Sequence, residues 1–186
     1  MTRICFWATA TVLMALPLSH AQASPRKVVA ITVSDEGVQT LQDLQASAAK
    51  LANDADQFKM MVNNPDLDSQ SQEPRLAALR EEINAMGREM HKLEAERDDL
   101  ALWEKQAIDQ TLPLLKDSAA NTENAIKYFN DNRPHLWTSA EYRNYAGQVW
   151  KDSEQMAKDL KNNLELAKLR GEEQHLNNSL GAAVGQ

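Results

Sequence analysis

Histidine and methionine are the side chains in this sequence that could hold a metal ion or a haem inside a helical protein. A carboxylate-bridged metal pair needs two Glu-x-x-His motifs and two further carboxylates, whereas the chain offers one such motif, Glu172 with His175. Met86 and Met90 stand just before His91 and keep a haem held by methionine and histidine as an alternative. Both methionines, however, fall on a regular apolar repeat, which core packing explains better. We therefore expect no cofactor.

Motifs for hydrolytic chemistry are missing from the sequence. His135 falls in a turn, and no Gly-x-Ser-x-Gly elbow accompanies it. The neighbouring acids Glu81 and Glu82 would point in different directions on a helix, so they indicate a solvated face and not a glycosidase dyad. Cys5 is the only cysteine and lies in the apolar leader, which excludes a thiol nucleophile from the rest of the chain. The sequence predicts that the protein is not an enzyme.

Four aromatic residues around the start of the last predicted helix form the candidate binding site. They are Trp137, Tyr142, Tyr145 and Trp150. Tyr142 fits the apolar stripe of that helix and its neighbours lie beside the stripe, so ordinary core packing is one interpretation. The other is an exposed aromatic patch that anchors a partner or a ligand.

The first 23 residues have the three parts of a secretory signal. Arg3 supplies the positive end, residues 4–18 are apolar and uncharged, and Ala21-Gln22-Ala23 is a small-x-small cleavage pattern. We expect cleavage after Ala23, with Ala21 as the second choice, and export to the periplasm or the medium. The apolar run is shorter than the roughly 20 residues that span a bilayer. No transmembrane segment is expected in the mature chain.

The charge of the chain argues against nucleic acid as a partner. The sequence has 27 acidic and 20 basic residues and a net charge of −7, and removal of the signal takes away Arg3 but no acid. Such a chain, without a basic stripe, gains nothing from phosphate contacts. Its abundance of Ala, Leu, Glu, Lys and Gln favours helices.

Apolar residues recur at steps of three and four along most of the chain, which predicts amphipathic helices. After an extended lead-in at residues 24–34, the first helix is expected from about Glu36 to Asn64. The second begins near Pro74 and has the clearest stripe. Its apolar positions are Leu76, Leu79, Ile83, Met86, Met90 and Leu93.

The pattern after this stripe leaves two questions open. Arg97 interrupts it, and the guanidinium either extends into water, which we favour, or pairs with an acid of another helix. Pro113 lies within the following apolar face, so either Thr111 caps a new helix or one long helix kinks there. We expect the kinked helix, about 85 Å long. The face itself contains Trp103, Ile108, Leu112, Leu115, Ala119, Ile126 and Phe129.

The last helix is expected to begin at a capping box, Thr138 with Glu141, and to end near His175. Residues 177–186 would form a flexible tail. Turns at residues 65–74 and 130–138 then produce two helical hairpins. The predicted fold is all-α: an elongated antiparallel bundle of three to four long helices, with coiled-coil-like seams, over residues 35–176.

Long seamed helices without catalytic motifs predict a non-enzymatic exported protein that acts by protein–protein contact. It would be an adaptor, a chaperone-like protein or a structural component of the envelope, and its partner would be another protein or a second copy of itself. The alternative is a periplasmic bundle that binds a small ligand, a metal or a haem through histidine and methionine.

Overall fold

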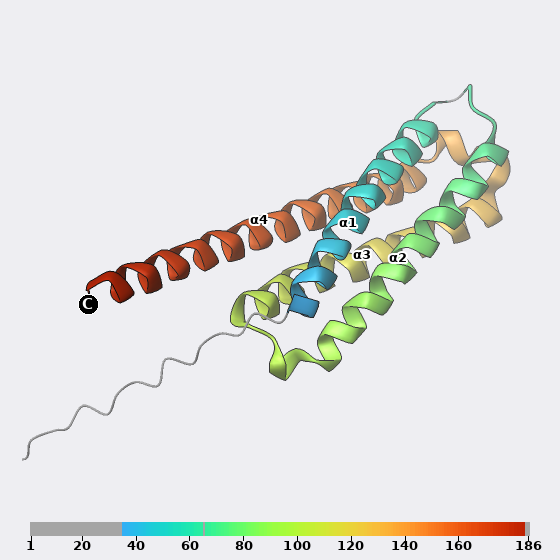
Figure 1. Ribbon diagram of the computed structural model, residues 1–186. Coiled ribbons are helices and arrows are strands. Elements are labelled where there is room, and N and C mark those ends of the chain that lie inside the picture. The colour runs from blue at the N-terminus through green and yellow to red at the C-terminus, as the bar shows by residue number, and fades with distance from the viewer. Residues whose placement is uncertain (1–34, 65, 185–186) are drawn as a thin grey trace, which may run out of the picture. The chain divides into compact units, whose positions relative to one another are not determined.

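The computed structural model describes residues 35–64 and 66–184, and every regular element within these ranges is helical. The predicted all-α class is confirmed. The signal, its cleavage site and the extended lead-in lie outside the described residues. The α-helices are α1 (Asp35–Val62), α2 (Gln72–Ala95), α3 (Leu102–Asn132) and α4 (Ala140–Val184), and the short 3₁₀ helices η1 (Ser69–Ser71), η2 (Arg97–Asp99) and η3 (Arg133–Thr138) precede α2, α3 and α4 (Figure 1).

The four α-helices pack as a ring around one core. α4 makes extensive contacts with both α1 and α3, and α2 closes the ring by packing against α1 on one side and α3 on the other. Consecutive helices run in opposite directions and are joined by short connections (Figure 1). This is the up-and-down arrangement of four-helix bundles, and it confirms the predicted antiparallel bundle.

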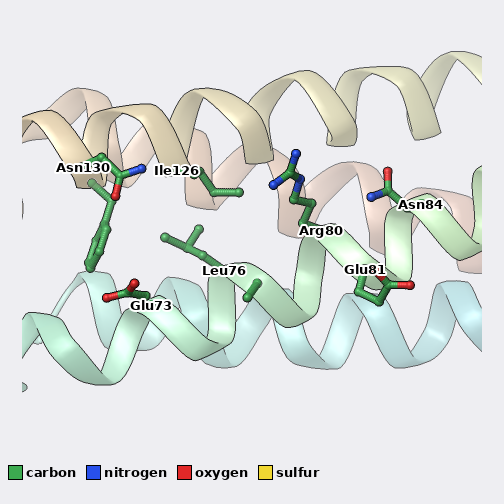
Figure 2. A pocket seen from close by; sticks show the side chains of 9 residues that line it. Glu73, Leu76, Arg80, Glu81, Asn84, Ile126 and Asn130 are labelled. Atoms are coloured by element: carbon green, nitrogen blue, oxygen red, sulfur yellow. The ribbon is translucent and has the colours of Figure 1, made fainter.

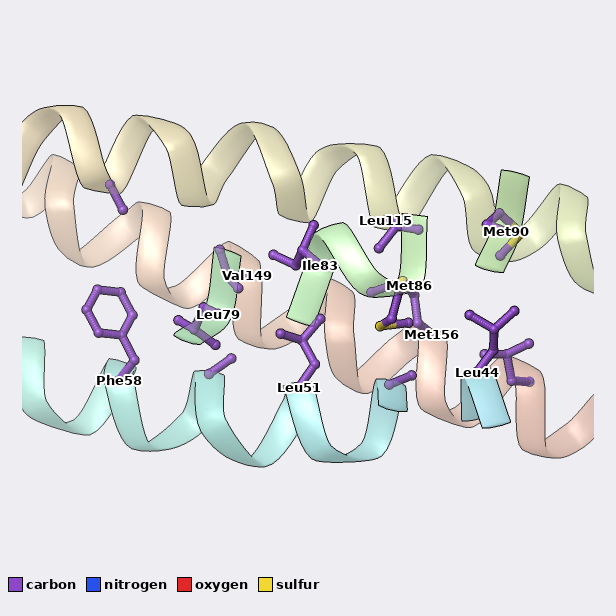
Figure 3. Close-up of a cluster of buried hydrophobic side chains, with 14 of the residues drawn as sticks. Leu44, Leu51, Phe58, Leu79, Ile83, Met86, Met90, Leu115, Val149 and Met156 are labelled. Atoms are coloured by element: carbon purple, nitrogen blue, oxygen red, sulfur yellow. The ribbon is translucent and has the colours of Figure 1, made fainter. Parts of the chain in front are cut away.

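The predicted apolar stripes meet inside this ring. Leu51 and Phe58 of α1, Leu79 of α2 and Val149 of α4 belong to one buried cluster (Figure 3). All the residues of the second stripe, from Leu76 to Leu93, are buried. Burial of a leucine or phenylalanine side chain contributes roughly 1.5–3 kcal/mol, so these stripes supply most of the drive to fold.

The chain reverses at residues 96–101, and the long kinked helix predicted through this region is wrong. α2 ends at Ala95, and a separate helix, α3, begins at Leu102. Arg97 does not simply extend into water. Its guanidinium donates to Glu94 at 2.7 Å and to both carboxylate oxygens of Asp109 at 2.7 and 2.8 Å. These bonds tie the end of α2 to the first turns of α3.

No helix boundary lies at Pro113, which sits inside α3. Thr111 does not cap a helix, because its hydroxyl donates to the carbonyl of Ala107 at 2.7 Å within the same helix. Proline removes one helical hydrogen bond, which leaves the carbonyl four residues earlier, that of Asp109, without its usual partner. Pro113 and Asp109 both lie on the exposed side of α3, where water can solvate that carbonyl.

α4 begins one residue later and ends later than the sequence predicted. The cap is Ser139 and not Thr138, because the hydroxyl of Ser139 accepts a hydrogen bond from the amide of Tyr142 at 3.1 Å. The helix continues past His175 to Val184, so the tail predicted from residue 177 is helical that far. Thr138 belongs to η3 instead.

Glu104 holds the start of α3 from a fully buried position. One oxygen of its carboxylate accepts a hydrogen bond from the amide of Ala101 at 2.6 Å, and the other has no hydrogen-bond partner among the described residues. Burial disfavours the charged form and raises the pKa of Glu104, while the bond from Ala101 lowers it by less.

Replacement of Glu104 by glutamine is expected to weaken the pH dependence of stability. Because the folded pKa is raised, the folded chain binds this proton more tightly than the unfolded chain. The free energy of unfolding should therefore fall as pH rises from about 4.3, the ordinary value, through the raised pKa. Glutamine keeps an acceptor for Ala101 but does not titrate, so the free energy of unfolding of the variant should change less with pH over this range. Urea unfolding followed by circular dichroism at several pH values measures this, and equal pH slopes for both proteins would contradict it.

Candidate functional site

Of the aromatic residues predicted to form a patch, Tyr142 lies in the core. Its ring stacks on Tyr128 with 5.8 Å between centroids and meets Phe58 edge-on at 5.9 Å. Its hydroxyl donates to the side-chain oxygen of Gln72 at 3.0 Å, which joins α4 to α2. Burial raises the pKa of Tyr142. This tyrosine cannot reach a partner without leaving the core.

Tyr145 and Trp150 are half-buried on α4 and contact other side chains of the bundle. The hydroxyl of Tyr145 donates to Glu141 at 2.6 Å, and this bond raises the pKa of Tyr145. The ammonium of Lys59, on α1, lies 3.3 Å from the ring centroid of Trp150. For Trp137 the structure describes the backbone alone, within η3. The binding role of these residues stays a prediction.

The hydroxyls of Tyr142 and Tyr145 should contribute differently to the stability of the fold. Tyr142→Phe removes the hydroxyl bonded to Gln72 and leaves a buried amide without its partner, so it should cost about 1–2 kcal/mol of stability. Tyr145→Phe removes a bond at the surface and is the matched control, with a much smaller effect expected. Chemical denaturation of both variants checks this, and an equal loss in the two would place the Tyr142 hydroxyl outside the stabilising core.

The structure describes the positions of several histidines and methionines that were considered as ligands of a metal or a haem. Met86 and Met90 are buried in the core, as their place in the apolar repeat indicated. His91 is exposed on α2. Among residues 35–64 and 66–184, no three or more His, Cys, Asp or Glu side chains are grouped so that they could hold a metal ion.

A shallow groove runs between α2 and α3. It contains adjoining hollows of about 390, 560 and 480 Å³ that share lining residues. On α2 it reaches from Glu73 to Ala95, which corresponds to about 33 Å of helix. Figure 2 shows one end, where Leu76 and Ile126 line the floor. The apolar lining residues are Leu76, Ile83, Met90, Leu112, Leu115, Ala119, Ile126 and Phe129.

The predicted apolar face of α3 is only partly covered: Trp103, Ile108, Leu115 and Phe129 are buried, whereas Leu112, Ala119 and Ile126 are half-buried and line the groove. Thr111, Ser118 and Thr122 occupy core positions on α3, and the hydroxyls of the latter two have no hydrogen-bond partner among the described residues. Leu112 and Ala119 each follow one of these residues and so lie about 100° around the helix. They are only half-buried and contribute to the groove. Apolar side chains that were expected in the core are thus partly open to solvent.

Gly87 widens the middle of the groove. A Cβ atom added at this position would meet no atom within 4 Å. Glycine inside a helix costs roughly 1 kcal/mol relative to alanine, and no close approach of another helix requires it here. The absence of a side chain keeps the floor open next to Ile83 and Leu115.

Ion pairs at the two ends of the groove connect α2 or η2 on one side to α3 or η3 on the other. At the end drawn in Figure 2, Arg80 reaches toward α3 and pairs with Glu123 at 2.8 Å, and Arg133 pairs with Glu73 at 3.1 Å. At the opposite end, Arg97 pairs with Asp109. These contacts hold the two helices in register.

One hollow of the groove has cations on both rims, and the adjoining hollow has Glu94 as well as Lys116 in its lining. Arg88 of α2 and Lys116 of α3 line the same hollow, together with His91. Arg88 reaches Glu81 on its own helix at 3.4 Å, and Lys116 forms no ion pair within residues 35–64 and 66–184. In a chain of net charge −7, the lining of this one hollow contains basic but no acidic side chains.

Sequence reasoning missed these groove residues. Arg88 and Lys116 have the pattern of ordinary solvated charges, and they become neighbours only through the reversal at residues 96–101. One signal was present: the apolar face containing Leu112 and Ile126 was rotated relative to the stripe of the preceding helix. That rotation marked a second apolar surface.

Comparison with known proteins adds no relative. No protein-family model, curated protein or solved structure matches this chain. Within the described ranges, none of the helices combines the length and apolarity needed to cross a bilayer.

Proposed function

We propose that this protein acts without catalysis, by binding another protein in the groove between α2 and α3. The observation that supports the proposal is that Leu112, Ala119 and Ile126 of α3 line the groove and are only half-buried, while hydroxyl residues occupy core positions of the same helix. With export after cleavage near Ala23, such a protein would serve as an adaptor, a chaperone-like protein or a structural component of the envelope.

An amphipathic helix is the partner element that fits this groove best. Helices dock in apolar grooves through residues spaced at three, four and seven positions. A groove about 33 Å long accommodates around six turns of helix, more than a small ligand would use. Carboxylates on the flanks of the partner helix would meet Arg88 and Lys116, which face the same hollow from opposite rims.

Site-specific photo-cross-linking tests the location of the contact. A cross-linking residue in place of Asn84, which lines the groove, should give a discrete product with one envelope protein. The same residue in place of the exposed Asn144 on α4 serves as the control and should not give it. The absence of a product at Asn84, or the same product at both positions, would refute a contact in this groove.

Filling the groove should abolish that product. A Cβ atom at position 87 would meet no other atom, so the bundle should stay folded in Gly87→Phe. The new ring would occupy the groove and exclude the partner, and the yield of the cross-linked product should fall at least about tenfold. Gly147→Phe is the matched control, because its Cβ also has open space. Circular dichroism of both variants verifies folding. Undiminished cross-linking in folded Gly87→Phe would count decisively against the proposal.

A further inference from the structure

The C-terminal part of α4 runs past the other helices and has an apolar stripe that its own bundle does not cover (Figure 1). Leu166, Leu169 and Leu176 are 50%, 61% and 61% exposed. With the exposed Glu173 they follow one another at steps of three, four and three, which places the four side chains along one face of the helix. The half-buried Ala167 lies on a different face. The stripe is therefore free to contact another molecule.

The floor of the groove between α2 and α3 has an apolar repeat of the same length. Its half-buried residues on α3, Leu112, Ala119 and Ile126, are seven residues apart. Leu169 and Leu176 are also seven apart, and seven residues advance a helix by about 10.5 Å. A helix laid along α3 can therefore bring both leucines onto this floor in one register.

Charged residues interrupt the two apolar repeats at the same place. Glu173 follows one leucine of the stripe by four residues and precedes the next by three, and Lys116 has this spacing between Leu112 and Ala119. Arg88 faces the same hollow from α2, and no acid is among its lining residues. A carboxylate over this hollow would meet both cations while the leucines on either side contact the apolar floor.

We propose that the exposed end of α4 is the helix that binds in the α2–α3 groove of a second copy of this chain. The pairing rests on the proposed function, since it names the molecule that occupies the same groove. Leu169 and Leu176 of one copy lie on the floor of the next, with Glu173 between Arg88 and Lys116. Because α4 is one continuous helix from Ala140 to Val184, its end cannot turn back into the groove of its own copy.

This contact is heterologous, because it joins two different surfaces of the chain. A copy that inserts its α4 end into a neighbour keeps its own groove open for a third copy. The assembly therefore grows head to tail instead of closing as a two-fold dimer. Growth of this kind favours the structural role over the adaptor and chaperone-like roles.

Two variants that each block one of the surfaces test the contact. Gly87→Phe fills the groove, and Leu169→Glu with Leu176→Glu places charges in the stripe. In sedimentation, the wild-type chain should form species larger than a dimer, and each variant alone should associate at least about tenfold more weakly. An equimolar mixture should form dimers and nothing larger, because one variant retains its α4 end and the other retains its groove.

Charge exchange tests the position of Glu173. Glu173→Lys should weaken association at least about tenfold, because it brings a third cation to Arg88 and Lys116. Addition of Lys116→Glu in the same chain should restore part of the loss. A loss that Lys116→Glu deepens would overturn the proposed register.

Control variants match the two blocks in size and charge. Gly147→Phe adds a ring where a Cβ atom also has open space, and Asn144→Glu with Gln155→Glu adds two charges at exposed positions of α4 within the bundle. Both controls should assemble like the wild-type chain. Circular dichroism should show the same helical content in every variant, because none of the substituted side chains belongs to the core.

A wild-type chain that stays monomeric up to about 1 mM would overturn the proposal, as would a mixture of the two folded blocking variants that forms no dimer. Cross-linking from Asn84 separates this pairing from the proposed function. A product joined to α4 of a second copy supports both. A product with a different protein overturns the pairing and keeps the groove as a binding site, whereas the absence of any product refutes both.

Discussion

Arg97 holds α2 and α3 together at the point where the chain reverses, since its guanidinium meets Glu94 on one side and Asp109 on the other. Exposed ion pairs contribute little to stability by themselves, so the apolar core drives folding. The pairing of Arg97 instead aligns the end of α2 with the first turns of α3. Together with the capping of Ala101 by Glu104, it turns one long apolar pattern into two antiparallel helices. The ring of four helices, the shared core and the α2–α3 groove all require that turn.

The fold class and most of the core could be predicted from the three-and-four spacing, because burial of apolar side chains dominates the free energy of folding and produces a regular sequence pattern. Turns produce a weaker pattern. The reversal at residues 96–101 contains no glycine or proline, and its strongest sign, Arg97 within the stripe, is equally compatible with a side chain that extends into water. The prediction placed a kink at Pro113 instead and continued one helix through residues 96–101, although a proline on the exposed face of a helix can be accommodated without a boundary. The ends of α4 shifted for a similar reason, since Ser139 competes with Thr138 for the cap.

The candidate groove was harder to predict, because it depends on what α3 does not bury. Hydropathy places leucine and isoleucine in the core, yet Ser118 and Thr122 are buried while Leu112 and Ile126 remain half-exposed. Burying a hydroxyl without a partner costs free energy that an apolar residue at the same position would avoid. A bundle optimised for stability alone would have apolar residues at positions 118 and 122. The observed arrangement is understandable if the apolar face is needed for contact with another molecule.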